Sequence, residues 1–374
     1  MTRRIFHAEE GPALKALLTL SLLVIVNLIL CGISLAEVKV IEADGTYLMG
    51  DNDSKIDARR IATQEAKRKA LELAGSYVES MTQVQNFQLT NDEIKSYTAG
   101  ILETEIVSEL MGGTAERPQV TVKVRCRIDT DTVVAQISRF RENEELKEQL
   151  NYAVQQKDAL QKERDALVQR LAAQTNKTQA AATQKKLDAV LSKEEANDDV
   201  NRVWVSIGPQ LLETDKNGRE ISTAELEKTS EILRNAVSRN PGNLRARSML
   251  AAVYQREKKF TSAEQELRAA IQINPSNALL HKKLGDLFTE QERYRDALRE
   301  YHFVERMKPH SPLVYFEIGT TYKSMMKCGL AVQNLNRFVR NPQSDRFPKK
   351  RDAALQMIDE CGGSRPGRVR HQGK

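Results

Sequence analysis

A repeat of 34 residues constrains the fold of this 374-residue chain more than any other feature. Its three clear units span residues 244–277, 278–311 and 312–345, and in each the apolar residues follow the spacing of two consecutive helices. Small residues recur where paired helices would cross, aromatic residues recur where neighbouring pairs would meet, and a proline ends each second helix. The sequence therefore predicts helix pairs stacked in a row. The recurring positions are Ala251, Gly285 and Gly319; Ala263, Ala297 and Ala331; Tyr254, Phe288 and Tyr322; and Pro275, Pro309 and, one place early, Pro342.

The pattern continues on both sides of these units. Residues 201–243 have the spacing of a fourth, irregular unit with a longer internal loop, residues 346–361 suit a capping helix, and residues 362–374 have the composition of a disordered basic tail. The stretch from about 198 to 361 resembles the tetratricopeptide repeat (TPR) family. That resemblance implies an all-α solenoid with a concave groove that binds a protein or peptide.

The resemblance also implies which residues line the groove, because fixed places along each first helix face it in that family. Four of the seven selected residues are cationic, which favours acidic or carboxy-terminal groups on the partner, and the one phenylalanine would serve as an apolar anchor. The alternative is an ordinary solvated surface. The groove residues are Arg245, Gln255, Arg256, Lys282, Asp286, Phe316 and Lys323.

Residues 1–36 have the pattern of an export signal. Basic residues precede an uncharged stretch over residues 16–36 and acidic residues follow it, which places the N-terminus in the cytoplasm and the remainder across the membrane. Cleavage after Ala36 would release the mature chain, whereas an uncleaved stretch of this length would remain as an inner-membrane anchor. We therefore expect the protein in the periplasm or cell envelope, with membrane contact through this segment.

Residues 37–141 predict a small α+β domain. Alanines recur at three- and four-residue steps between Ala58 and Tyr77, which predicts a helix that ends near Gly75. The small residues on its face would let the helix approach a sheet closely. The expected strands are 38–43, 81–89, 101–110 and 120–128, with a short helix over 91–97.

Three segments of this domain carry a second resemblance. Residues 58–80, 92–100 and 120–129 resemble the N-terminal domain of flagellar assembly protein T and its LPP20-like relatives. The resemblance implies a small envelope domain used in extracytoplasmic assemblies. Cys126 lies on the apolar face of the last predicted strand, which indicates a buried, inert thiol.

Residues 142–197 predict a polar helical linker. Leucines recur in steps of four and three as far as Leu171, with Lys157 and Arg164 at two of the seam positions. Two interpretations remain open: a weak parallel coiled coil through residues 142–171 that makes a homo-oligomer, or a solitary charged helix. Beyond Leu171 the leucine pattern fades into Gln-, Lys- and Ala-rich sequence, which indicates a linker.

Cys328 and Cys361 occupy nearly equivalent places in the third repeat and in the cap. Equivalent places in adjacent repeats lie roughly 10 Å apart, whereas a disulfide needs Cα atoms within about 7 Å. The two residues are therefore either free thiols or a disulfide that requires a local tilt.

The sequence contains no motif of a catalytic or cofactor-binding site. Nucleophile elbow, phosphate-binding loop, dinucleotide fingerprint and paired-cysteine metal motif are all missing from it, and His281 occupies a core position. The net charge of +6 is concentrated at one end, since residues from Asp345 onward hold eight Lys and Arg against four Asp and Glu. We therefore expect no catalytic residue, no metal, no cofactor and no nucleic-acid partner.

Together these features predict a mostly α chain: an α+β N-terminal domain, a helical spacer and an all-α TPR solenoid. The expected function is that of a non-enzymatic exported scaffold or adaptor, which binds a protein partner in the bacterial cell envelope, in an envelope or surface-appendage assembly. The alternative is a membrane-tethered structural subunit that self-associates through the coiled coil and the repeats.

Overall fold

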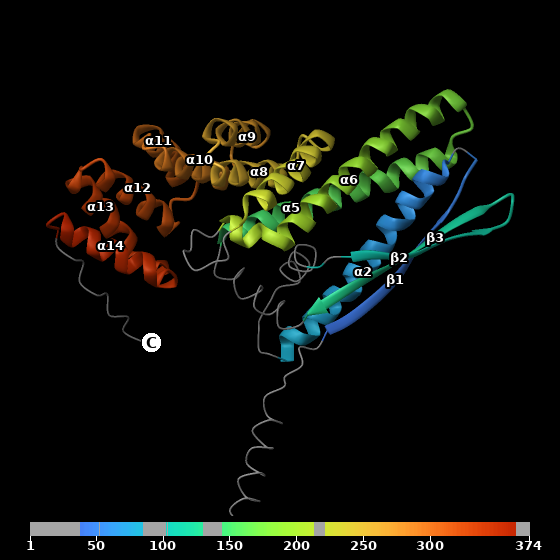
Figure 1. The fold of residues 1–374 in the computed structure, drawn as a ribbon, viewed down its shortest axis with the longest axis horizontal. Coiled ribbons are helices and arrows are strands. Elements are labelled where there is room, and N and C mark those ends of the chain that lie inside the picture. Colours follow the sequence, from blue (N-terminus) through green and yellow to red (C-terminus); the bar gives the residue numbers. More distant parts are fainter. Residues whose placement is uncertain are drawn as a thin grey trace, which may run out of the picture.

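The computed structural model describes residues 38–51, 53–84, 102, 104–129, 144–212 and 221–363. Within these residues it has three strands and eleven α-helices, arranged as a small sheet with one long helix, a helical hairpin and a curved row of shorter helices (Figure 1). The predicted mostly α fold with an α+β N-terminal part is confirmed. The export segment 1–36, the expected helix over 91–97 and most of the tail 362–374 lie outside the described residues. In the described part of the chain, no helix is both long and apolar enough to cross a bilayer.

The sheet is antiparallel and has the order β1 (Val38–Leu48), β3 (Pro118–Asp129), β2 (Thr104–Gly113). Strand β3 lies at its centre and pairs with β1 along its whole length. Alternate residues of a strand point to the same face, and one face of β3 is covered by helix α2 (Lys55–Val84). The residues of that face are all buried: Val120, Val122, Val124, Cys126 and Ile128.

Helix α2 approaches the sheet closely because its contacting face consists of alanines. Ala58, Ala62, Ala66, Ala70 and Ala74 follow one another at four-residue steps and each is 0% exposed. Opposite them, β1 places Gly45. A Cβ atom at this position would lie 2.0 Å from the Ala62 carbonyl oxygen and 2.3 Å from the Ala66 backbone nitrogen.

The sequence prediction for this helix was wrong at its C-terminal end. The helix continues through Gly75 to Val84, so residues 81–84 of the strand expected over 81–89 are helical. The reason is that the buried face continues through Ala74 and Val78, while Gly75 lies off that face. Packing against the sheet thus outweighs the low helix propensity of one glycine.

The polar middle of the chain forms a helical hairpin. Helix α5 (Glu144–Ala173) turns back into α6 (Lys177–Leu212), and the two helices pack along each other. The linker expected beyond Leu171 is the second helix of this hairpin, and its apolar residues pack against the leucines of α5. The hairpin core contains Leu160, Leu167, Leu171, Leu187, Val190 and Leu191.

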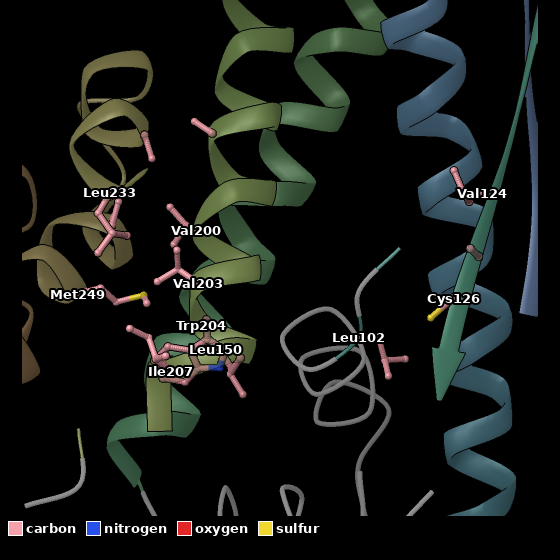
Figure 2. Packing of buried hydrophobic residues seen from close by; sticks show 14 of the residues in the cluster. Leu102, Val124, Cys126, Leu150, Val200, Val203, Trp204, Ile207, Leu233 and Met249 are labelled. Atoms are coloured by element: carbon pink, nitrogen blue, oxygen red, sulfur yellow. The ribbon is translucent and has the colours of Figure 1, made fainter. Parts of the chain in front are cut away.

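The far end of the hairpin shares a core with the first helices of the repeat array. Figure 2 shows Leu150 of α5 beside Trp204 and Ile207 of α6, with Val200 and Val203 facing residues of the next two helices. Those helices are α7 (Thr223–Arg239) and α8 (Leu244–Arg256), which contribute Leu233 and Met249. The first helix of the irregular repeat is thus the last part of α6.

The array continues with regular helix pairs whose bounds fall within the predicted repeats. Its further helices are α9 (Phe260–Ile273), α10 (Ala278–Glu290), α11 (Tyr294–Met307), α12 (Pro312–Ser324), α13 (Cys328–Arg340), the short 3-10 helix η1 (Pro342–Arg346) and α14 (Pro348–Glu360).

Local backbone features recur with the same period. The N-caps of α8, α10 and α12 are Asn243, Asn277 and Ser311, and the two asparagine side chains accept hydrogen bonds from backbone N–H groups of the first turn. The turn between the helices of each pair has one left-handed residue: Lys258 at φ 61°, Glu292 at φ 58° and Met326 at φ 59°. The 34-residue period is therefore found in the helix caps and in the turns as well as in the buried residues.

Candidate functional site

The first helices α8, α10 and α12 form one side of the array, which we call the inner face. In Figure 1, α9 and α11 lie on the outer side of the arc and α8 and α10 on the inner side. Side chains connect adjacent first helices: Gln255 donates a hydrogen bond to Glu290, and the Lys258 ammonium lies 2.8 Å from the same carboxylate. The inner face is thus a continuous polar surface near the C-terminal ends of α8 and α10.

Two of the predicted groove residues lie in this surface as a pair. Lys282 Nζ is 2.7 Å from Asp286 Oδ2, and the other carboxylate oxygen of Asp286 accepts a 2.8 Å hydrogen bond from the Tyr301 hydroxyl. Burial, followed by the charge of Asp286, raises the pKa of Tyr301 well above its ordinary value. Tyr301 therefore remains a hydrogen-bond donor that fixes the orientation of Asp286.

Arg256 and Gln255 lie at the C-terminal end of α8. The Arg256 side chain is exposed, and its Nη2 donates a 3.0 Å hydrogen bond to the backbone oxygen of Gln210 at the end of α6. This bond holds the guanidinium by one of its terminal nitrogens, so the exposed cationic group has a defined position on the inner face.

The structure removes two predicted residues from the accessible groove. Arg245 is 5% exposed and Phe316 is 8% exposed. The Arg245 guanidinium lies 4.4 Å from the Trp204 ring centroid, whereas Phe316 packs edge-on against Phe338 at 5.3 Å. Both residues are parts of the core, so neither can be the cationic contact or the apolar anchor expected from the sequence.

Helix α14 covers the α12 end of the inner face. Lys323 of α12 pairs with Glu360 of α14, and Lys350 of α14 lies 2.7 Å from Glu317 of α12. The last predicted groove residue, Lys323, therefore forms an ion pair with the capping helix α14.

Helix α5 lies along the N-terminal ends of the first helices, from α8 toward α12, which the sequence did not indicate. Gln156 donates a 2.9 Å hydrogen bond to the Gly242 carbonyl just before α8, and Glu148 lies 2.6 Å from the ammonium of Lys308. The accessible part of the inner face therefore lies toward the C-terminal ends of the first helices. Arg256, Lys258, Glu290 and Ser324 are exposed there.

Cys328 and Cys361 form a disulfide with their Cα atoms 5.2 Å apart. Cys328 is the first residue of α13 and Cys361 is the C-cap of α14, so the antiparallel packing of these helices brings the two ends together. The bridge joins the cap to the last complete repeat.

Loss of this bridge is expected to lower the free energy of unfolding of the C-terminal repeat. The disulfide closes a loop with a sequence separation of 33, and bridges of this kind contribute about 2–4 kcal/mol. Urea unfolding of Cys328→Ser, or of the reduced protein, would measure the loss. The variant should also be insensitive to reductant; equal midpoints for the oxidised and reduced wild-type protein would contradict the expectation.

The described part of the chain shows no gathering of side chains suited to metal binding. No group of three or more His, Cys, Asp and Glu residues able to hold a metal occurs there. His281 is buried, stacks on Phe303 at 3.8 Å and contacts Glu300 at 2.7 Å, as expected of a core histidine. Burial raises the pKa of the free Cys126 thiol to about 11, which makes it a poor nucleophile.

The stacked pairs, the shared inner face and the periodic caps define an α-helical repeat array of the tetratricopeptide type. Residues 225–287 match the tetratricopeptide repeat family model. The solved structure titled MamA AMB-1 is similar, with a TM-score of 0.32 and 16% identity over 48% of this chain and 96% of that chain. The solved structure of MamA from residue 41 to the end, from Desulfovibrio magneticus RS-1, is also similar. It has a TM-score of 0.34 and 9% identity over 46% of this chain and 93% of that chain. No curated protein matches the chain.

Proposed function

We propose that this protein is a non-enzymatic, exported adaptor that uses its tetratricopeptide-type repeats to bind a protein partner in the bacterial cell envelope. The observation that carries the proposal is the inner face toward the C-terminal ends of the first helices, a polar surface on a repeat array. Repeat arrays of this kind bind peptides or proteins along such surfaces. Export rests on the charge pattern around residues 16–36.

The chemistry of the inner face favours a partner segment with both polar and acidic groups. Arg256 and Lys258 are exposed cations on this face, Lys258 is paired with Glu290, and Gln255 and Thr289 supply further polar groups. Because a guanidinium binds carboxylates through paired hydrogen bonds, we place an acidic side chain or a carboxy-terminus of the partner at Arg256.

Photo-crosslinking in the native bacterium would capture the partner in place, so that mass spectrometry can identify it. A photoreactive residue at Ser324 or Glu290 on the inner face should capture a second protein. The same residue at Arg299 of α11, whose side chain is 70% exposed on an outer helix, is the matched control. Identical products from both faces would contradict binding at the inner face.

Charge reversal then tests the proposed contact. Arg256→Glu is expected to weaken binding of the captured partner by about tenfold or more, because a charge-assisted hydrogen bond is replaced by like-charge repulsion. Arg299→Glu should bind as the wild type does. Titration of the labelled partner against each purified variant gives the dissociation constants, and circular dichroism checks that each variant remains folded. Equal affinity of both variants would remove Arg256 from the site.

The second candidate, a membrane-tethered subunit that self-associates through α5, has less support. The seam residues Leu150, Leu160, Leu167 and Leu171 are buried within the same chain, so a second copy could reach them only after the hairpin opened. Capture of a second copy of this chain by the inner-face crosslinker would favour this candidate over the adaptor.

A further inference from the structure

Three buried polar side chains border a small cavity between α5 and the repeats. The cavity has a volume of about 20 Å³ and lies among Gln149 of α5, Arg245 and Ser248 of α8, and residues at the start of α10. Gln149, Arg245 and Ser248 are 5%, 5% and 3% exposed. This cavity is separate from the exposed inner face described above.

The same three residues carry polar atoms that form no hydrogen bond with any described residue. These atoms are both amide atoms of Gln149, Nε and Nη2 of Arg245, and the hydroxyl of Ser248. Arg245 donates only one long hydrogen bond, 3.4 Å from Nη1 to Asn201. A buried polar group without a partner costs about 1–3 kcal/mol, and more when it is charged, so a group of such atoms around one cavity indicates a ligand.

The acidic residues nearby do not neutralise Arg245. Glu148 lines the same cavity, but its carboxylate lies 2.6 Å from Lys308. A larger cavity of about 550 Å³ also borders Arg245, and there Asp198 pairs with Lys67 and Glu194 with Arg164. Burial lowers the pKa of Arg245 to about 9, which is the direction expected of a cation that lacks a counter-charge.

We propose that Arg245, Gln149 and Ser248 bind a single monoatomic anion of the size of chloride, and that this anion holds α5 against α8. The donors are Nε–H and Nη2–H of Arg245 and the amide N–H of Gln149. The Ser248 hydroxyl rotates freely, so it donates either to the anion or to the Gln149 oxygen. A cavity of about 20 Å³ has room for one or two water-sized species, which excludes sulfate and phosphate.

A neutral water molecule would fill the same space but would leave the charge of Arg245 uncompensated. Removing a charged side chain from water costs several kcal/mol unless an opposite charge accompanies it. The anion supplies that charge at the junction where α5 covers the start of α8 and α10, so docking of the hairpin becomes dependent on the anion.

The test compares unfolding of the full chain, purified in a mild non-ionic detergent, in sodium chloride and in sodium gluconate at equal ionic strength. Chloride should raise the midpoint in a saturating manner in the wild type, and gluconate should not. Arg245→Met, which replaces the buried cation by an apolar side chain of similar length, should abolish the chloride response. Arg337→Met is the matched control, because Arg337 also stacks on an aromatic ring, Tyr315 at 4.2 Å, but its side chain is 52% exposed. It should keep the full response.

Equal responses to the two salts, or an unchanged chloride response in Arg245→Met, would overturn the proposal in favour of water. If Arg245→Met does not fold, wild-type crystals grown in sodium bromide decide the question. An anomalous bromide peak between Arg245 and Gln149 supports the site, and the absence of a peak there overturns it.

Discussion

A single methyl group at Gly45 is expected to separate helix α2 from the sheet. In Gly45→Ala the new carbon would lie 2.0 Å and 2.3 Å from backbone atoms of Ala62 and Ala66, and backbone atoms cannot move aside as a side chain can. Overpacked cores lose about 1–3 kcal/mol when side chains can adjust, so we expect a loss above about 3 kcal/mol. Hydrogen exchange of the β3 amides would measure it directly.

Gly112→Ala is the matched control for this substitution. Gly112 lies in β2 of the same sheet, and a Cβ atom there would meet no described atom within 4 Å. The control should change β3 protection little. Similar exchange rates for the two variants would show that α2 does not rest on Gly45.

Breaking the ion pair inside the hairpin is the second change with a large expected effect. The side chains of Arg164 and Glu194 are 5% and 8% exposed, and Arg164 Nη1 lies 3.1 Å from Glu194 Oε1. At alkaline pH, where Glu194 is ionised, Arg164→Met leaves a buried carboxylate without its partner, which typically costs about 3–5 kcal/mol. Arg164→Met combined with Glu194→Leu should recover most of that loss, because an apolar pair of similar volume replaces the ions. A double variant no more stable than the single one would contradict this account.

The same pair sets a pH dependence. Burial raises the pKa of Glu194 from 4.5 to about 7 despite the opposing charge of Arg164. Because the folded state then holds the proton more tightly than the unfolded state, the stabilisation is present at low pH and is lost as the pH rises from 4.5 to about 7. In Arg164→Met the pKa should rise further and the loss should extend to higher pH. Urea midpoints across this range would measure both curves.

The repeats were predictable because each of them repeats the same local information. Small residues and aromatic residues recur every 34 positions and prolines nearly so, so each weak signal is supported by several others. The helix pairs therefore follow from local signals alone, with no need for long-range contacts.

The hairpin was not predictable in the same way. Arg164 at a seam position weakens the apolar pattern of α5, and only the partner Glu194, 30 residues later, explains it. Arg245 and Phe316 were misassigned for a related reason: the places they occupy are exposed in an isolated repeat, and here α5, α6 and α14 cover them. Such burial depends on elements outside the repeat.

Helix α6 also sets a distance. Its 36 residues form one unbroken helix, about 54 Å long at about 1.5 Å per residue. Around its middle, Asp188 and Glu195 bind Arg60 of α2, and in its last third Trp204 enters the core shared with α7 and α8. One rigid helix thus contacts both α2 beside the sheet and the first helices of the repeat array. A partner bound to the repeats is therefore kept at a fixed distance from the sheet. Lengthening α6 by whole turns would increase this distance in steps of about 5.4 Å.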